Sequence, residues 1–247
     1  MVLNVAAYHF APVEAPAALA ARLRAHAADA GLRGTVLVAP EGVNLFLAGA
    51  EAAVRAHVEL VRAEPGFGDL RAKYSRSATP PFARLKVKVK REIIAFRREN
   101  ASPLAGRAPE VAPETLARWL AQGRDDAGRR LVLLDTRNRE EVAYGTFAGA
   151  LTLPIDNFTD LPEALAPHRE SLTDATVVSF CTGGIRCEKA ALWMRATGME
   201  NVLQLDGGIL GYFERVGGQG YDGACFVFDE RVALGPDLAP AAAPTAG

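Results

Sequence analysis

The chain has 247 residues, of which 49% are hydrophobic and 23% charged, and its formal net charge is -1. This length favours two domains of ordinary size, and this composition is that of a soluble globular protein rather than a disordered or membrane one. No apolar run reaches the roughly 20 residues needed to span a bilayer, and the first ten residues lack the pattern of a secretory signal, so we expect a cytoplasmic protein with no membrane segment.

Residues 1–98 predict an α+β domain. Apolar runs and amphipathic stretches follow in the order strand, helix, strand, strand, helix, strand, at residues 2–10, 16–31, 35–39, 43–48, 50–63 and 70–74. Pro40, Glu41 and Gly42 separate the second and third strands and are typical of a hairpin. This order is that of a ferredoxin-like fold, in which two helices cover one face of an antiparallel sheet.

A basic strand is expected after these elements. Its cations alternate with aliphatic residues, so an extended chain would bury the aliphatic side and expose the charges. One interpretation is contact with nucleic-acid phosphates, because the lysines would stand about 7 Å apart; the other is that lysines keep an edge strand unpaired. The candidate RNA-binding residues are Arg84, Lys86, Lys88, Lys90 and Arg91.

The distribution of charge bears on the same question. Residues 1–107 hold 16 Lys and Arg against 9 Asp and Glu, whereas the remainder holds 12 against 20. A basic half can bind a polyanion, and it can equally attract the acidic half of its own chain.

The rest of the chain predicts a linker, a parallel α/β domain and a tail. Residues 99–114 are rich in Pro and Ala without periodicity, which indicates a linker. Residues 115–220 alternate helix and strand, at 116–120, 131–134, 140–144, 176–180, 187–197, 202–205 and from 209 onward. A separate segment at 221–234 contains CFVFDERV, and residues 235–247 are expected to be a disordered tail.

The residues that point to chemistry follow the apolar strand at 176–180. Unpaired amides and the partial positive charge of the next helix favour an anion there, and two glycines let several amides face one point. A thiolate held in this way would be a nucleophile near neutral pH, and we assign it to Cys181. The active-site loop is Cys181, Thr182, Gly183, Gly184, Ile185, Arg186 and Cys187.

The other titratable groups are assigned more modest functions. Three cysteines form no disulfide framework, and packing is favoured for Cys187 and Cys225, with a resolving thiol as the alternative for Cys187. Four scattered histidines lack the spacing of metal ligands, so we expect no metal.

Two groups of residues resemble rhodanese domains. The stretch from Leu134 to Arg137 with Glu141 resembles the first signature, and Cys181 to Arg186 followed by Asp206, Gly207 and Gly208 resembles the second. Arg186 comes five positions after the cysteine, as in rhodanese sulfurtransferases, whereas the related cell-division phosphatases have one residue more. The resemblance therefore implies a parallel-sheet rhodanese-like domain with sulfur chemistry rather than phosphate hydrolysis.

A wider resemblance covers most of the chain. The segments 40–44, 85–90, 135–141, 145–147, 181–189 and 225–232 resemble bacterial oxygen-dependent tRNA uridine(34) hydroxylases. This implies conversion of the wobble uridine to 5-hydroxyuridine, molecular oxygen as co-substrate, the tRNA anticodon region as partner, and Cys181 as a persulfide-bearing cysteine. It also implies that Arg186 and the loop amides hold sulfur or a substrate oxygen.

The resemblance gives Asp135 and Arg137 a supporting place behind the loop, and a purely structural ion pair is the alternative. No flavin fingerprint or metal ligand set is evident, so an unidentified reductant is expected. Two other functions stay open: a plain sulfurtransferase working through a Cys181 persulfide, and a non-enzymatic RNA-binding or redox-sensing module.

Overall fold

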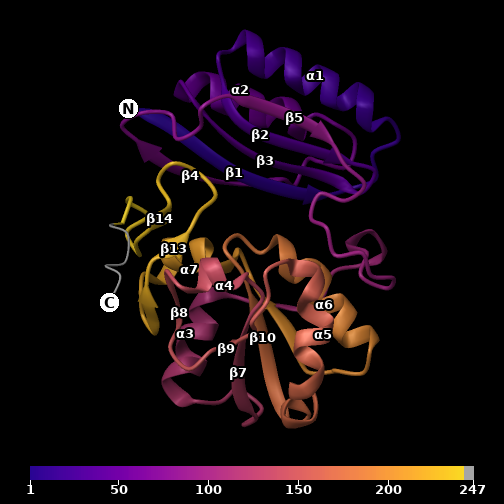
Figure 1. Cartoon of the computed structure of the whole chain (residues 1–247), viewed down its shortest axis with the longest axis vertical. Helices are drawn as coiled ribbons and strands as arrows, with labels where there is room; N and C mark the ends of the chain where they lie inside the picture. Colours follow the sequence, from indigo (N-terminus) through magenta and orange to yellow (C-terminus); the bar gives the residue numbers. More distant parts are fainter. Residues whose placement is uncertain (242–247) are drawn as a thin grey trace. The chain divides into compact units, whose positions relative to one another are not determined.

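The computed structural model describes residues 1–241, which form two compact units, Met1–Ala95 and the chain from Phe96 onward. The first unit is a five-stranded sheet with two helices (Figure 1). Its strands run in the order β4-β1-β3-β2-β5, with β5 parallel to β2 and the other pairs antiparallel. The elements are β1 (Val2–Phe10), α1 (Pro16–Asp29), β2 (Arg33–Ala39), β3 (Gly42–Gly49), α2 (Glu51–Arg62), β4 (Arg71–Ser77) and β5 (Leu85–Val89).

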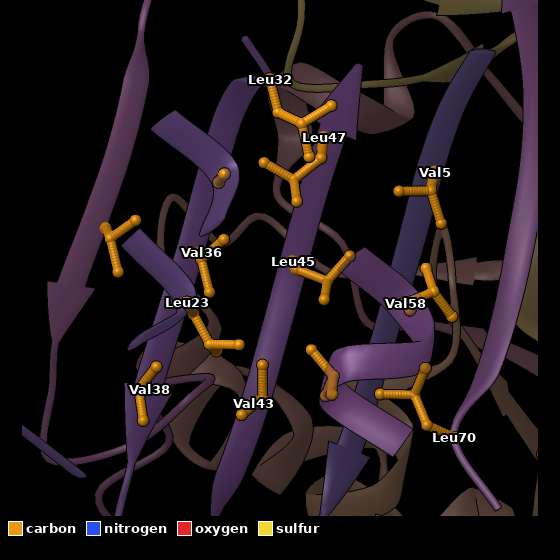
Figure 2. Close-up of a cluster of buried hydrophobic side chains, with 14 of the residues drawn as sticks. Val5, Leu23, Leu32, Val36, Val38, Val43, Leu45, Leu47, Val58 and Leu70 are labelled. Carbon is orange, nitrogen blue, oxygen red and sulfur yellow. The ribbon is translucent and has the colours of Figure 1, made fainter. Parts of the chain in front are cut away.

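The core of this unit lies between the sheet and the two helices. Figure 2 shows Leu23 and Val58 from the helices together with strand residues such as Val36 and Leu45. Helix α1 buries Leu19, Leu23 and Ala27 because these positions recur on one face of a 3.6-residue helix. The predicted ferredoxin-like α+β fold is confirmed, with β5 as an additional edge strand.

Strand β5 carries the predicted basic face, with one difference. Val87 is buried and Lys86, Lys88 and Lys90 are exposed, as the alternation predicts. Val89 was expected to be buried but is 51% exposed. It ends an edge strand that has only one neighbour, so few side chains are available to cover it.

The second unit is built on a parallel sheet in the order β6-β11-β10-β7-β9. All six residues of the central strand β10 are buried, as expected for a strand covered on both faces. The strands are β6 (Glu110–Val111), β7 (Arg130–Asp135), β9 (Leu151–Thr152), β10 (Ala175–Phe180) and β11 (Val202–Leu205).

Helices pack against both faces of this sheet, with α5 and α6 on one side and α3 and α7 on the other (Figure 1). The helices are α3 (Pro113–Gln122), α4 (Arg139–Val142), α5 (Leu161–Leu165), α6 (Ile185–Ala196) and α7 (Gly208–Val216), with 3-10 turns at Pro103–Ala105, Phe158–Asp160, Ala166–His168 and Glu170–Leu172. Two short antiparallel ladders complete the unit: β8 (Gly145–Phe147) with β12 (Tyr221–Gly223), and β13 (Cys225–Phe226) with β14 (Ala233–Leu234). The predicted parallel α/β domain is confirmed.

The segment 99–114 is not a simple linker. It contributes β6 to the sheet, and Arg107 forms an ion pair with Glu188 of α6. The unit boundary also follows Ala95 rather than residue 98, because Phe96 stacks on Phe158 at a ring-centroid distance of 4.5 Å. Apolar residues spaced along a Pro-rich stretch can pack without periodicity, which is why the sequence pattern missed them.

The predicted disordered tail is also wrong for residues 235–241. The Gly235 amide donates to the Ala239 carbonyl at 2.9 Å, and the Ala241 amide donates to Ala233 at 2.9 Å, so this stretch folds back on β14. The remaining tail residues, 242–247, lie outside the described part of the chain. Within residues 1–241, no helix is both long and apolar enough to cross a membrane.

Candidate active site

The cysteine loop lies where β10 ends and α6 begins, at the carboxyl edge of the parallel sheet. Gly184 adopts φ +101 immediately before the helix, a conformation that a glycine reaches without strain. Helix α6 starts at Ile185, two residues earlier than expected, so Arg186 and Cys187 belong to its first turn. The free amides of that turn therefore face back into the loop.

Those amides point at the sulfur of Cys181. The Gly184 amide donates to Sγ at 3.2 Å, and the Arg186 amide is a second donor. Burial of Cys181, which is only 1% exposed, opposes its ionisation. The Cys187 thiol, the Arg186 charge and the two amides outweigh that burial and lower the pKa of Cys181 to about 6. Cys181 is thus held as a thiolate near neutral pH.

The turn at Gly207 and Gly208 supports the loop from behind. The amides of Ile209 and Leu210 donate to the carbonyls of Cys181 and Thr182 at 2.9 and 3.0 Å. A Cβ on Gly208 would lie 2.4 Å from the Cys181 carbonyl oxygen and 2.7 Å from the Gly184 nitrogen, at φ +62. Only a glycine fits at position 208, which gives the structural reason for the Asp206–Gly207–Gly208 part of the rhodanese-like motif.

Arg186 is committed to an ion pair inside the protein. Its guanidinium donates to both carboxylate oxygens of Glu141, at 2.7 and 2.6 Å, and the two side chains are 9% and 1% exposed. Glu141 also caps α4 by accepting the Asn138 amide at 3.0 Å. Arg186 therefore supplies a fixed positive charge beside the sulfur and joins α6 to α4. In the sequence Glu141 stands only as part of the first rhodanese-like motif, and no local pattern indicates its ion pair with Arg186.

Asp135 and Arg137 form a second, fully buried ion pair at the end of β7. Arg137 donates to Asp135 at 2.7 and 2.9 Å and to the Gly145 carbonyl at 2.6 Å, and Thr146 donates to Asp135 at 2.8 Å. The Asp135 carboxylate accepts hydrogen bonds on both oxygens, whereas Nη1 of Arg137 is buried with no hydrogen-bond partner among the described residues. This geometry fits the structural alternative, and Asp135 pairs in the sheet with Phe180, the residue before Cys181.

Cys187 and Cys225 are both fully buried. Burial, and the hydrogen bond and charge of Cys181, raise the pKa of Cys187 well above its usual value. Burial raises the pKa of Cys225 to about 12. Cys181 is therefore the one cysteine of the three that ionises near neutral pH.

The structure brings all the predicted loop residues and the Asp135 pair into one region of the second unit. The five basic residues belong to the first unit and are exposed. Within residues 1–241, no group of three or more His, Cys, Asp or Glu side chains is placed to hold a metal ion.

An ionised cysteine in an amide cradle after the central strand of a parallel sheet defines a rhodanese-type domain. Residues 114–215 match the rhodanese-like domain, and residues 2–93 match the UPF0176 acylphosphatase like domain. The chain is 66% identical over 240 residues to the tRNA uridine(34) hydroxylase of Xanthomonas euvesicatoria pv. vesicatoria, covering 97% of both chains. The hydroxylase of Xylella fastidiosa is 63% identical, covering 97% of this chain and 93% of its own. The chain belongs to the tRNA uridine(34) hydroxylase family.

Solved structures show weaker likenesses to each half. A human single-domain sulfurtransferase is 31% identical, with a TM-score of 0.36, and covers 44% of this chain and 97% of its own. The acylphosphatase of Bacillus subtilis is 21% identical, with a TM-score of 0.29, and covers 36% of this chain and 99% of its own.

Proposed function

We propose that this protein hydroxylates the wobble uridine of tRNA at C5, with Cys181 as the catalytic residue. The observation that carries the proposal is the Cys181 sulfur in its amide cradle, within a chain whose relatives over nearly their whole length are tRNA uridine(34) hydroxylases. A tRNA substrate also agrees with the cytoplasmic location expected from the sequence.

The reaction needs partners from outside the chain. Uridine, O2, two electrons and two protons give 5-hydroxyuridine and water, so the proposal requires molecular oxygen and a two-electron reductant. Cys181 would react as the thiolate or, after accepting a sulfane sulfur, as a persulfide in the same cradle. The Gly184 and Arg186 amides would stabilise either anion, and the Arg186 charge would favour it further.

The basic strand of the first unit is the proposed contact for the tRNA anticodon region. Lys86 and Lys88 are exposed on β5, with Arg84, Lys90 and Arg91 beside them in the chain. Cations that contact phosphates contribute sequence-independent affinity, which leaves recognition of the base to the site around Cys181.

Analysis of tRNA nucleosides by mass spectrometry tests the proposal. Deleting the gene in its native host should remove 5-hydroxyuridine and the nucleosides derived from it, and the wild-type gene should restore them. Cys181→Ser should fail to restore them, whereas Cys225→Ser, which alters a buried cysteine that does not ionise, is the matched control and should succeed. Unchanged nucleosides in the deletion strain would refute the hydroxylase function.

Sulfur transfer is the second candidate, because the Cys181 cradle alone is sufficient for it. A thiolate that accepts sulfane sulfur and passes it to a thiol needs no oxygen and no RNA. Release of thiocyanate from thiosulfate and cyanide measures this activity. Sulfur transfer at full rate in a protein whose deletion leaves the tRNA nucleosides unchanged would favour it over hydroxylation.

A further inference from the structure

A row of three aromatic side chains lies beside the cysteine loop. Tyr144 follows α4, Phe226 belongs to β13, and Phe228 lies two residues further on. Their ring centroids are 5.1 Å apart for Tyr144 and Phe226 and 5.0 Å apart for Phe226 and Phe228. Phe228 ends the row and is 66% exposed.

The row is attached to the active-site loop by its backbone. The Thr182 hydroxyl donates to the Phe226 carbonyl at 3.4 Å, and Thr182 is the neighbour of Cys181 in the chain. The Ala224 amide donates to the Tyr144 carbonyl at 2.8 Å. Cys225, between these contacts, is fully buried. The strand that carries Phe226 is therefore hydrogen-bonded to the loop that holds the reacting sulfur.

The exposed ring is held by an ordered hairpin. The Val227 amide donates to Val232 at 2.8 Å, and the Val232 amide donates to Asp229 at 3.0 Å. Arg231 forms an ion pair with Asp229, and these side chains are 11% and 6% exposed. These hydrogen bonds and this ion pair limit the freedom of the Phe228 side chain to turn into the core, so its ring stays available to a ligand.

We propose that Phe228 is the stacking surface for the uracil ring of the substrate nucleotide, with Phe226 and Tyr144 supporting it from behind. The inference rests on the proposed hydroxylase function and names the residue that positions its substrate. A base in the anticodon loop must leave its stack to reach a buried sulfur, and an aromatic face replaces the lost stacking. At the hairpin tip the Asp229 charge is paired with Arg231, which leaves the exposed Glu230 carboxylate, and an anion there suits a neutral base better than a phosphate.

Binding of two anticodon stem-loop RNAs tests this assignment without requiring turnover. One RNA carries uridine at position 34 and the other an abasic site there. The wild-type protein should bind the first more tightly by about 5- to 150-fold, the range measured for stacking of one base on an aromatic side chain. Phe228→Ala should bind the two RNAs equally, and Phe228→Trp should keep the preference.

Two further readouts separate positioning from folding. Phe228→Ala should raise the KM for the stem-loop more than it lowers kcat, since the Cys181 cradle is untouched. Leu104→Ala, which removes another exposed apolar side chain of the same unit at 43% exposure, should leave the preference and KM unchanged.

The outcomes distinguish the two proposals. If the wild-type protein shows no preference for uridine at position 34, no side chain stacks on that base and the inference is refuted, while the nucleoside analysis of the deletion strain decides the hydroxylase function separately. If the wild type shows the preference and Phe228→Ala retains it, the stacking surface lies elsewhere and the inference is refuted while the hydroxylase function stands.

Discussion

The ionisation of Cys181 depends on the neighbouring thiol of Cys187, and Cys187→Ala tests this directly. Burial works against the thiolate, and the Cys187 hydrogen bond is the largest of the contributions that lower the pKa of Cys181 to about 6. At that pKa about nine-tenths of the thiol is ionised at pH 7, against a few per cent for an ordinary thiol.

Removing the hydrogen bond should raise the pKa of Cys181 by about 1 to 2 units, because a hydrogen bond to a charged group contributes roughly 1.5 to 3 kcal/mol. The ionised fraction at pH 7 should then fall to between about one half and one tenth. Hydroxylation at pH 7 should fall in proportion and recover at higher pH. Cys187→Ser keeps a donor at the same place and is the matched control, with the pKa of Cys181 staying low.

The ultraviolet absorbance of the thiolate, followed against pH, measures this pKa. Cys181→Ser serves as the blank, and the raised pKa values of Cys187 and Cys225 keep those thiols from titrating in the same range. A wild-type midpoint in the ordinary thiol range, or an identical midpoint in Cys187→Ala, would refute the electrostatic reasoning.

Three other predictions follow from the same geometry. Gly208→Ala should raise the pKa of Cys181 and abolish most activity, because the new Cβ would lie 2.4 Å from the Cys181 carbonyl oxygen. Gly149→Ala is the control, because Gly149 has a similar φ of +71 but its Cβ would meet no atom within 4 Å. Equal losses of activity in the two variants would contradict the steric explanation. The pKa of Cys181 is lower in the folded protein than in the unfolded chain, so its thiolate contributes stability above about pH 8.5 that is lost as the pH falls toward 6. Denaturant titrations should therefore show that the free energy of unfolding of Cys181→Ser depends less on pH over this range than that of the wild type. Lys86→Glu with Lys88→Glu should weaken tRNA binding several-fold and reduce its salt dependence, both measured by filter binding. An unaltered salt dependence would mean that these lysines do not contact phosphates and only keep an edge strand unpaired.

The sequence alone predicted the two fold classes correctly and located the cysteine loop at a strand–helix junction, since both depend on local patterns. The wholly apolar strand before Cys181, the two glycines and the following helix define the loop within about 20 consecutive residues, so short-range rules apply. The order of strands and helices in residues 2–77 likewise specified the first unit.

Tertiary structure decided which distant residues meet. Glu141 pairs with Arg186 across 45 positions, the Gly208 turn presses on the Cys181 backbone, and Phe226 meets Thr182 from 44 positions away. Segment 99–114, without any periodic pattern, proved to be part of the second unit through β6 and Arg107. Such contacts leave no local signal in a single sequence, because they depend on how separate elements pack and not on the spacing of residues within one element.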